Sequence, residues 1–315
     1  MSDRVKAKRL DGSIPVWRSL RFWQSAGQVG AAMGIAIALG VLGDNLLFNL
    51  EQIGIRLGFD FLGSQAGFTI SDTILPYTPA DSYQIALLVG VVNSLRVIGL
   101  GLILATAIGI TAGIARLSAN WLVRTIAQIY VETLRNTPLL LQLFFWYFAV
   151  FLALPNAASP LQILGWTLSS RGVTGWGLQM SSEFASLLAG LSLYTGTFIA
   201  EIIRGGIQSV SRGQGEAARS LGLKPLPTLW LVVFPQALRA ILPPLANQYL
   251  NLAKNSSLAV AIGYPDLYAI SSTTFNQTGR AVEVMAIVMV AYLVMSLSIS
   301  LLINIYNRSI QLVER

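Results

Sequence analysis

The sequence predicts an all-α integral membrane protein with about six membrane-spanning helices. Of its 315 residues, 54% are hydrophobic and only 11% are charged, whereas an average soluble domain carries roughly 25% charged residues. A membrane helix needs about 20 mostly apolar residues, and the chain contains several apolar segments of that length. We expect the six helices at about 27–50, 85–115, 122–153, 183–210, 237–254 and 280–306.

The first predicted helix follows a basic N-terminus. Its apolar run, from Val29 to Gly43, is followed by Asp44-Asn45 rather than by a small-residue cleavage site. This pattern favours a retained signal-anchor helix over a cleaved signal peptide. Residues 1–26 would then be a cytoplasmic basic segment, and 27–84 would hold the first helix and a polar outer loop.

The basic residues predict the side of the membrane on which each segment lies. Residues 1–25 carry six Lys and Arg, whereas 44–85 carries one basic residue and five acidic ones. Because cytoplasmic segments are enriched in Lys and Arg, we expect both chain ends and the insert at 212–235 inside, and 44–85 and 155–181 outside. The net charge of +7 then reflects cytoplasmic loops, and no nucleic-acid partner is expected.

The composition excludes several kinds of site. The chain has no Cys and no His, which removes Cys or His metal sites, disulfides, Cys nucleophiles and Ser-His-Asp catalysis. None of its four lysines is followed by Ser or Thr, so it lacks the Walker A phosphate loop. We therefore expect no catalytic residues, no metal site and no cofactor bound by this chain.

A polar insert, "EAARSLGLKPLPTLWLVVFP", lies between the fourth and fifth predicted helices, from Glu216 to Pro235. It is expected to form a helix, a turn and a second helix. Gly222 can adopt the left-handed conformation that ends the first helix, and Pro225 and Pro227 can start the second. The result would be a compact, partly apolar knob, which suits either a docking element or an ordinary interfacial loop.

The insert resembles the EAA loop of permease subunits of ABC importers. The family's usual closure is Ile-x-Leu-Pro, and the chain has Val232-Val233-Phe234-Pro235 at that position. The resemblance implies that 212–235 is a coupling helix, which enters a groove on an ATP-binding subunit and receives the stroke of ATP hydrolysis. The residues that would make this contact are Glu216, Ala217, Ala218, Arg219, Leu221, Gly222 and Pro235.

Three further segments narrow the resemblance. "VETLRNTPLLLQLFF" (131–145), "YTGTFIAEIIRGGIQSV" (194–210) and "PQALRAILPPLANQYLNLAKNSSLAVAIG" (235–263) are similar to polar amino-acid permeases of the histidine/glutamine type. The likeness covers a permease core at 85–310. The extra first helix and long outer loop resemble the general L-amino-acid branch of these permeases.

This resemblance implies a function and partners. The chain would be the transmembrane subunit of an ATP-driven importer in the bacterial inner membrane, moving L-amino acids by alternating access. A soluble periplasmic binding protein would deliver the substrate. Two ATPase subunits would bind ATP and Mg. The permease subunits would act in pairs, and we expect the second one to be a related chain rather than a second copy of this chain.

Charged side chains inside the predicted spans are costly and therefore informative. Glu132 and Arg135 lie three residues apart on the third helix, and Glu201 and Arg204 repeat this spacing on the fourth, so each pair shares one helix face. The pairs could be structural ion pairs or parts of a gate. Glu201 could alternatively face a cavity and meet the ammonium group of an amino acid.

Polar residues on the fifth helix recur on one face. This face lines either a subunit interface or the substrate path, because lipid contact would leave its polar groups unsatisfied. Asn251 and Lys254 could bind a substrate carboxylate, although ordinary helix–helix hydrogen bonds are the alternative for such residues. The candidates for the substrate path are Gln142, Tyr194, Thr195, Glu201, Asn247, Asn251, Lys254, Asn255 and Ser256.

The main alternative function is a stand-alone secondary transporter or channel for small polar solutes. It predicts transport without an ATPase and, in many such transporters, an internal repeat, which the sequence does not clearly contain. A membrane enzyme would need a catalytic constellation that we do not find. A purely structural scaffold would leave the EAA pattern unexplained.

Overall fold

The computed structural model describes residues 20–52 and 57–310, and most of these are helical. Within the described residues, five helices are long and apolar enough to cross a membrane. They agree with the predicted spans at 27–50, 85–115, 183–210, 237–254 and 280–306. These helices are α1 (Leu20–Gln52), α2 (Tyr83–Ala115), α5 (Ser182–Ser209), α8 (Phe234–Asn255) and α10 (Ala281–Ile310).

The chain divides into two compact units, Met1–Gly58 and Phe59–Arg315. The first contains α1, which is apolar around its whole circumference, with nearly every described side chain exposed. A helix that is hydrophobic all round suits a lipid environment, where apolar side chains need no protein partner. The basic residues predicted to anchor its cytoplasmic end, at 1–19, lie outside the described residues.

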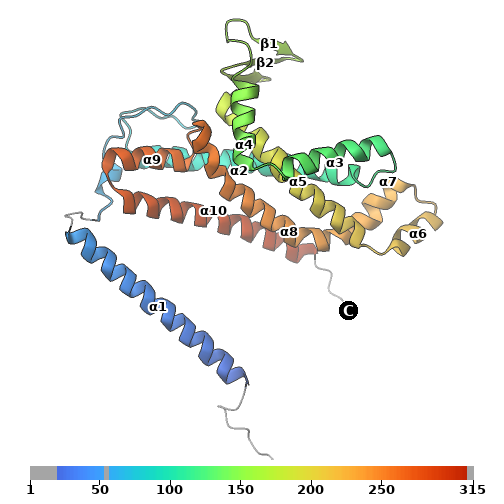
Figure 1. Cartoon of the computed structure of the whole chain (residues 1–315), viewed down its shortest axis with the longest axis horizontal. Coiled ribbons are helices and arrows are strands. Elements are labelled where there is room, and N and C mark those ends of the chain that lie inside the picture. The colour runs from blue at the N-terminus through green and yellow to red at the C-terminus, as the bar shows by residue number, and fades with distance from the viewer. Residues whose placement is uncertain (1–19, 53–56, 311–315) are drawn as a thin grey trace, which may run out of the picture. The chain divides into compact units, whose positions relative to one another are not determined.

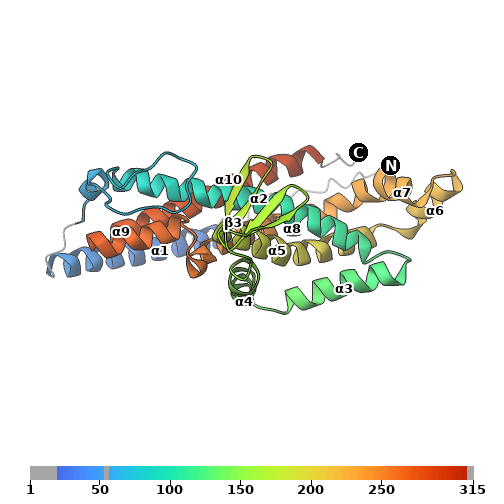
Figure 2. The ribbon, with the colours of Figure 1, turned by 90° about the horizontal axis from the view of Figure 1, so that it is seen from above.

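The core of the second unit forms where α2 packs against α5. Gly109 and Gly113 of α2 lie against Ile199 and Ala200 of α5, and a Cβ at Gly113 would come within 2.7 Å of the Ala200 carbonyl oxygen. Small residues therefore allow the two backbones to approach closely. In both views α2, α5, α8, α9 (Leu267–Thr278) and α10 run broadly along one direction (Figures 1 and 2).

The prediction of a single helix at 122–153 is wrong. The chain instead forms α3 (Trp121–Arg135), a break, α4 (Leu139–Phe144) and a π-helical turn, η3 (Phe145–Phe151). Pro138 causes the break, because it lacks a backbone N–H and disfavours helical conformation in the preceding residue. As a result α4 leaves α3 at a steep angle (Figures 1 and 2).

The all-α prediction is also wrong at 161–181, which forms a four-stranded antiparallel meander. Two of its hairpins turn at Leu164-Gly165 and Trp176-Gly177, where all four residues have positive φ. Such paired left-handed residues are typical of the two-residue turns that match the twist of antiparallel strands. The strands are β1 (Leu161–Ile163), β2 (Trp166–Ser169), β3 (Gly172–Gly175) and β4 (Leu178–Ser181).

The segment at 59–82 is folded back onto the helices rather than left as an open loop. It starts with a short 3-10 helix, η2 (Asp60–Gly63), and its two ends meet at a bridge between Gln65 and Ser82. Phe61 and Ala66 are buried in the main hydrophobic core. The outer polar loop predicted from charge is therefore an ordered covering over one end of the helices.

Candidate coupling segment and polar clusters

The predicted coupling segment forms a helix, a glycine turn and a second short helix. The helices are α6 (Arg212–Ser220) and α7 (Pro225–Thr228), and a π-helical turn, η4 (Leu229–Val233), leads from them into α8. Figure 1 shows α6 and α7 at the end of the molecule opposite α9. The sequence prediction of a proline-started second helix is confirmed by Pro225 at its first position.

Gly222 ends α6 as predicted, with a left-handed φ of +82°. The N–H of Leu223 donates to the carbonyl of Ala218 at 3.1 Å, and the N–H of Gly222 donates to that of Arg219 at 2.9 Å. This pair of bonds is the Schellman motif, which satisfies carbonyls that the helix end would leave free. The turn is therefore fixed by local hydrogen bonds alone.

Most of the predicted coupling residues lie on the surface of this segment. Ala218 is only 4% exposed and supports the turn from beneath, whereas Leu221 is 85% exposed. No described residue pairs with the Glu216 side chain. The exposed members of the predicted set are Glu216, Ala217, Arg219, Leu221, Gly222 and Pro235.

A hydrogen bond connects the coupling segment to the start of α8. The Gln236 amide donates to Gln214 of α6 at 3.3 Å and to the carbonyl of Val232 at 2.9 Å. Next to it, a cavity of about 800 Å³ separates the end of α5 from the start of α8. The segment is thus bound directly to the first turn of a membrane helix.

Glu201 is the centre of a three-residue charge cluster. One carboxylate oxygen pairs with Arg116 at the end of α2, and the other pairs with Arg204 at 2.8 Å. Arg204 also donates to Gln208 at 2.7 Å. Each oxygen of Glu201 is therefore paired with an arginine in this conformation, and an ammonium group would have to share the carboxylate with these two positive charges.

Glu132 and Arg135 do not pair with each other in the described part of the chain. Glu132 accepts a hydrogen bond from Gln128 at 2.8 Å, and the Arg135 guanidinium lies 5.3 Å from the centre of the Phe198 ring. Arg135 is thus attracted to an aromatic face of α5 rather than to the carboxylate one turn away. Arg135 therefore contacts α5, whereas Glu132 is bound within α3 itself.

The polar residues of α8 divide between an exposed and a buried face. Asn247, Asn251 and Lys254 are exposed, Asn255 is half-buried, and Ser256 is buried and donates to the Ala253 carbonyl. An exposed polar face on a membrane helix is costly against lipid. The exposed three therefore suit a water-filled path or a subunit interface, whereas Ser256 faces the core.

The remaining path candidates lie inside the bundle. Gln142 is buried and donates to the carbonyls of Leu134 and Thr137 at 2.7 and 2.9 Å, so it satisfies the backbone at the break after α3. Thr195 is buried, and Tyr194 stacks edge-on with Phe198. All three side chains support packing in this conformation.

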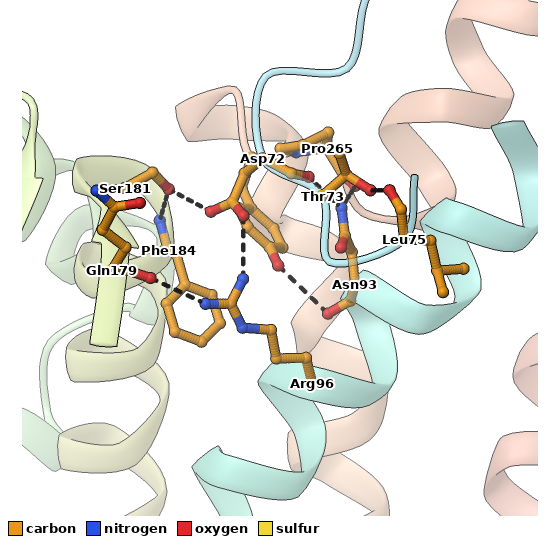
Figure 3. Close-up of polar contacts among 10 residues, drawn as sticks. Asp72, Thr73, Leu75, Asn93, Arg96, Gln179, Ser181, Phe184 and Pro265 are labelled. Atoms are coloured by element: carbon orange, nitrogen blue, oxygen red, sulfur yellow. Dashed lines mark hydrogen bonds and ion pairs between the residues drawn. The ribbon is translucent and has the colours of Figure 1, made fainter. Parts of the chain in front are cut away.

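A polar cluster where the folded segment, α2 and the meander meet was not predicted from the sequence (Figure 3). Asp72, in the folded segment, pairs with Arg96 of α2 at 3.0 Å and accepts from Ser181 at 2.7 Å. Asn93 donates to the carbonyls of Asp72 and Pro265 at 2.7 and 2.9 Å. These contacts join four segments that are far apart in the sequence.

Asp266, next to this cluster, is a buried carboxylic acid. It caps the start of α9 by accepting from the Ala269 N–H at 2.8 Å, and it accepts from the Tyr292 hydroxyl at 3.2 Å. Burial raises the pKa of Asp266 to about 7, because desolvation disfavours the charged form. The role of Asp266 was not predicted from the sequence, although an Asp directly before an apolar helical run is typical of an N-cap.

Comparisons with known proteins agree with these features. Residues 105–312 match the family model described as a binding-protein-dependent transport system inner membrane component. The putative amino-acid ABC transporter permease protein YhdX of Escherichia coli (strain K12) is 39% identical over an alignment of 369 residues, which covers 91% of this chain and 94% of that protein. The general L-amino acid transport system permease protein AapQ of Rhizobium johnstonii is 36% identical, and the alignment covers 86% of this chain and 88% of that protein.

A solved structure supports the same assignment. The crystal structure of an amino acid ABC transporter with histidines is 28% identical to this chain, with a TM-score of 0.58, and the match covers 72% of this chain and 95% of that one. The predicted resemblance is thus confirmed. The chain belongs to the inner membrane components of binding-protein-dependent transport systems: it is a multi-pass permease subunit of the inner membrane, in a family whose ATPase is a separate partner subunit.

Proposed function

We propose that this permease subunit imports L-amino acids, which a soluble periplasmic binding protein delivers, and moves them across the inner membrane by alternating access. The observation that carries the proposal is that relatives aligned over most of the chain are named for amino-acid transport. A third relative, at 36% identity, is named as a glutamate/glutamine/aspartate/asparagine permease. The chain would bind no cofactor, and ATP and Mg would lie in two partner ATPase subunits.

The proposed topology has six crossings and both ends in the cytoplasm. Five crossings would leave the ends on opposite sides, so α3 and the apolar segment Leu139–Phe151 would together supply the sixth. The bond between Ser181 and Asp72 supports this arrangement, because it requires 59–82 and 155–181 to lie at the same end. The proposed segments are 1–26 (basic N-terminus), 27–84 (first helix and outer loop), 85–310 (permease core) and 212–235 (coupling loop).

The second permease subunit would be a related chain and would cover part of the exposed surface of α8. Its exposed polar face, at Asn247, Asn251 and Lys254, is poorly suited to lipid. A partner helix, a water-filled path, or a path between the two subunits would satisfy these groups. We infer that this face of α8 borders the path, where Lys254 would bind a substrate carboxylate. Glu201 of α5 would bind the ammonium group through a carboxylate that it shares with its arginine partners.

This assignment of the path is tested by two substitutions in the assembled transporter. Lys254→Met and Glu201→Gln are each expected to reduce uptake by about tenfold or more, since hydrogen bonds to charged groups contribute about 1.5–3 kcal/mol. Initial uptake rates at several amino-acid concentrations would measure this change. Normal uptake by both variants would remove these residues from the path and leave Glu201 as a structural partner of its two arginines.

The coupling role is tested at Gly222. An added side chain would meet nothing within 4 Å there, so only the left-handed backbone opposes substitution. Gly222→Val should disrupt the turn, because β-branched residues are genuine outliers at positive φ, whereas Gly222→Asn should preserve it. We expect ATP-dependent uptake in proteoliposomes to be lost with Val and largely retained with Asn.

The outcomes of this experiment are distinct. Loss of uptake in a Gly222→Val complex that still assembles and binds ATP would support a coupling role for α6 and α7. Equal uptake by both variants would contradict that role. Robust uptake by the chain without any ATPase would instead favour the stand-alone secondary transporter.

A further inference from the structure

A polar cavity lies between the folded segment at 59–82, α2 and the meander. Its volume is about 450 Å³, within the range of roughly 300–1,000 Å³ that is usual for small-molecule sites. Its lining is mainly polar, which suits a hydrated ligand better than an apolar one. The residues around it are Ser71, Asp72, Thr73, Ile74, Arg96, Ser169, Arg171, Gly172, Thr174, Gln179, Met180 and Ser181.

Two of the three charged groups of the cavity are paired with each other, and the third is not paired with any described residue. Asp72 and Arg96 are largely buried, with side chains 14% and 17% exposed, and they hold each other. The Arg96 guanidinium also lies 3.9 Å from the centre of the Phe184 ring. Arg171, by contrast, is exposed, and no described residue pairs with it. The cavity thus combines a fixed ion pair with one positive charge that is available to a ligand.

The backbone position of Arg171 is constrained by the turn that contains it. It lies in the turn between β2 and β3, where Gly172 has a φ of +137° and is too close to Met180 of β4 for any side chain. Ser71 also lines the cavity, and no described group bonds to its hydroxyl. Available hydrogen-bonding groups therefore come from the folded segment and from the meander.

We propose that this cavity is an access site that binds L-α-amino acids as they pass from the binding protein to the membrane path. Arg171 would bind the α-carboxylate, and the oxygens of Asp72 and Ser71 would accept from the α-ammonium group. The inference rests on the proposed function, because it requires an amino-acid cargo and an outer location for the meander. It adds a site that recognises the α-carboxylate and α-ammonium groups, which all α-amino acids share, and that does not select among their side chains.

The two charges of the ligand explain why this cavity suits an amino acid better than a simple anion. The cavity offers two arginines and one carboxylate, so a zwitterion can meet both signs at once. Because Asp72 and Arg96 already neutralise each other, the electrostatic attraction of either group for the ligand is reduced. Binding would be weak, as a site that must also release its ligand requires.

The absence of native cysteine allows a direct test of occupancy. A Thr174→Cys variant in the assembled transporter, without ATP or binding protein, is labelled with a neutral maleimide. L-Glutamine is expected to slow this labelling about tenfold at ten times its dissociation constant. L-Glutaminamide, which lacks the carboxylate, should not slow it. A Gln162→Cys variant is the matched control, because Gln162 is exposed on β1 but does not line the cavity.

Arg171→Gln in the Thr174→Cys background should weaken the protection about tenfold, since it removes one charge-assisted hydrogen bond. Unchanged labelling at saturating L-glutamine, in a complex that still transports, would overturn the access site and leave the proposed function standing. Protection by L-glutamine in a complex with no uptake would support the site while the proposed function failed.

Discussion

The two ends of the second unit are held together in different ways. At the coupling end, the turn after α6 is fixed by hydrogen bonds between residues three and five positions apart, and its surface stays exposed. At the opposite end, Asp72, Asn93, Arg96 and Ser181 connect segments separated by 21 to 109 residues. The first arrangement leaves the proposed docking surface exposed, and the second attaches a covering segment to the helices.

This difference leads to opposite expectations for mutations. At the coupling end, an exposed residue contributes little to folding, so its removal should impair transport while stability is maintained. At the opposite end, a residue with several long-range contacts should first affect stability. Removing a charge at each end and measuring both transport and stability therefore distinguishes a docking surface from a structural connection.

The largest loss of stability is expected from Arg96→Met. It leaves the largely buried Asp72 carboxylate without its counterion and removes the contact with Phe184. Removing one partner of a buried ion pair typically costs about 3–5 kcal/mol, and the residual exposure of this pair favours the lower value, about 3 kcal/mol. Thermal unfolding of the purified complex would measure the loss.

The matched control for this prediction is the double variant Arg96→Met/Asp72→Asn. It removes both charges, so it should be less destabilised than the sum of the single variants. If the two single losses simply add, the ion pair does not connect the covering segment to α2. In that case the difference between the two ends would rest on the hydrogen bonds of Asn93 and Ser181 alone.

A smaller, pH-dependent effect is expected at Asp266. Its pKa is raised by burial from 3.8 to about 7, so the folded state keeps a proton that the unfolded state has lost at intermediate pH. Stability should therefore fall as pH rises from about 4 to 7, by up to about 1.4 kcal/mol per pH unit. Asp266→Asn can still cap α9, and it should remove this contribution to the pH dependence.

Unfolding of both proteins at several pH values between 4 and 8 would test this. The variant should gain stability relative to the original chain as pH rises, and the difference should level off above pH 7. Parallel pH profiles would show that Asp266 is ionised in the folded protein throughout this range. Activity measurements are not needed for this comparison.

The coupling end could be predicted from the sequence because its signals are local. Gly222, Pro225 and Pro227 each restrict the backbone at their own position, so the helix, turn and second helix followed directly from the residues. The long spans were equally accessible, since a membrane helix is defined by a continuous apolar run. The break after α3 was not predicted, because the apolar residues on both sides of Pro138 together have the length of one membrane span.

The opposite end was not predicted because its contacts are not local. Asp72 is one of five acidic residues in the predicted outer segment at 44–85, and Arg96 lies within the predicted span at 85–115. Nothing in their separation of 24 residues predicts that they meet. The strands at 161–181 are only three or four residues long, too short for the alternation that identifies a strand. Their turns contain Leu164 and Trp176 at positive φ, which residue preferences do not suggest.

The smallest effect on stability is expected from Glu216→Gln. Glu216 is exposed on α6, and none of the described side chains pairs with it, so its neutralisation should change the free energy of unfolding by no more than about 0.5 kcal/mol. Uptake should nevertheless fall by about tenfold if the carboxylate contacts the ATPase, as expected for a lost hydrogen bond to a charged group. Asp60→Asn, which neutralises an exposed acid in η2, is the matched control and should leave uptake unchanged. Unfolding curves and ATP-dependent uptake measured on the same preparations would compare the two. Equal uptake by both variants would remove Glu216 from the docking surface, and the coupling role would then depend on the shape of the turn at Gly222 rather than on its charge.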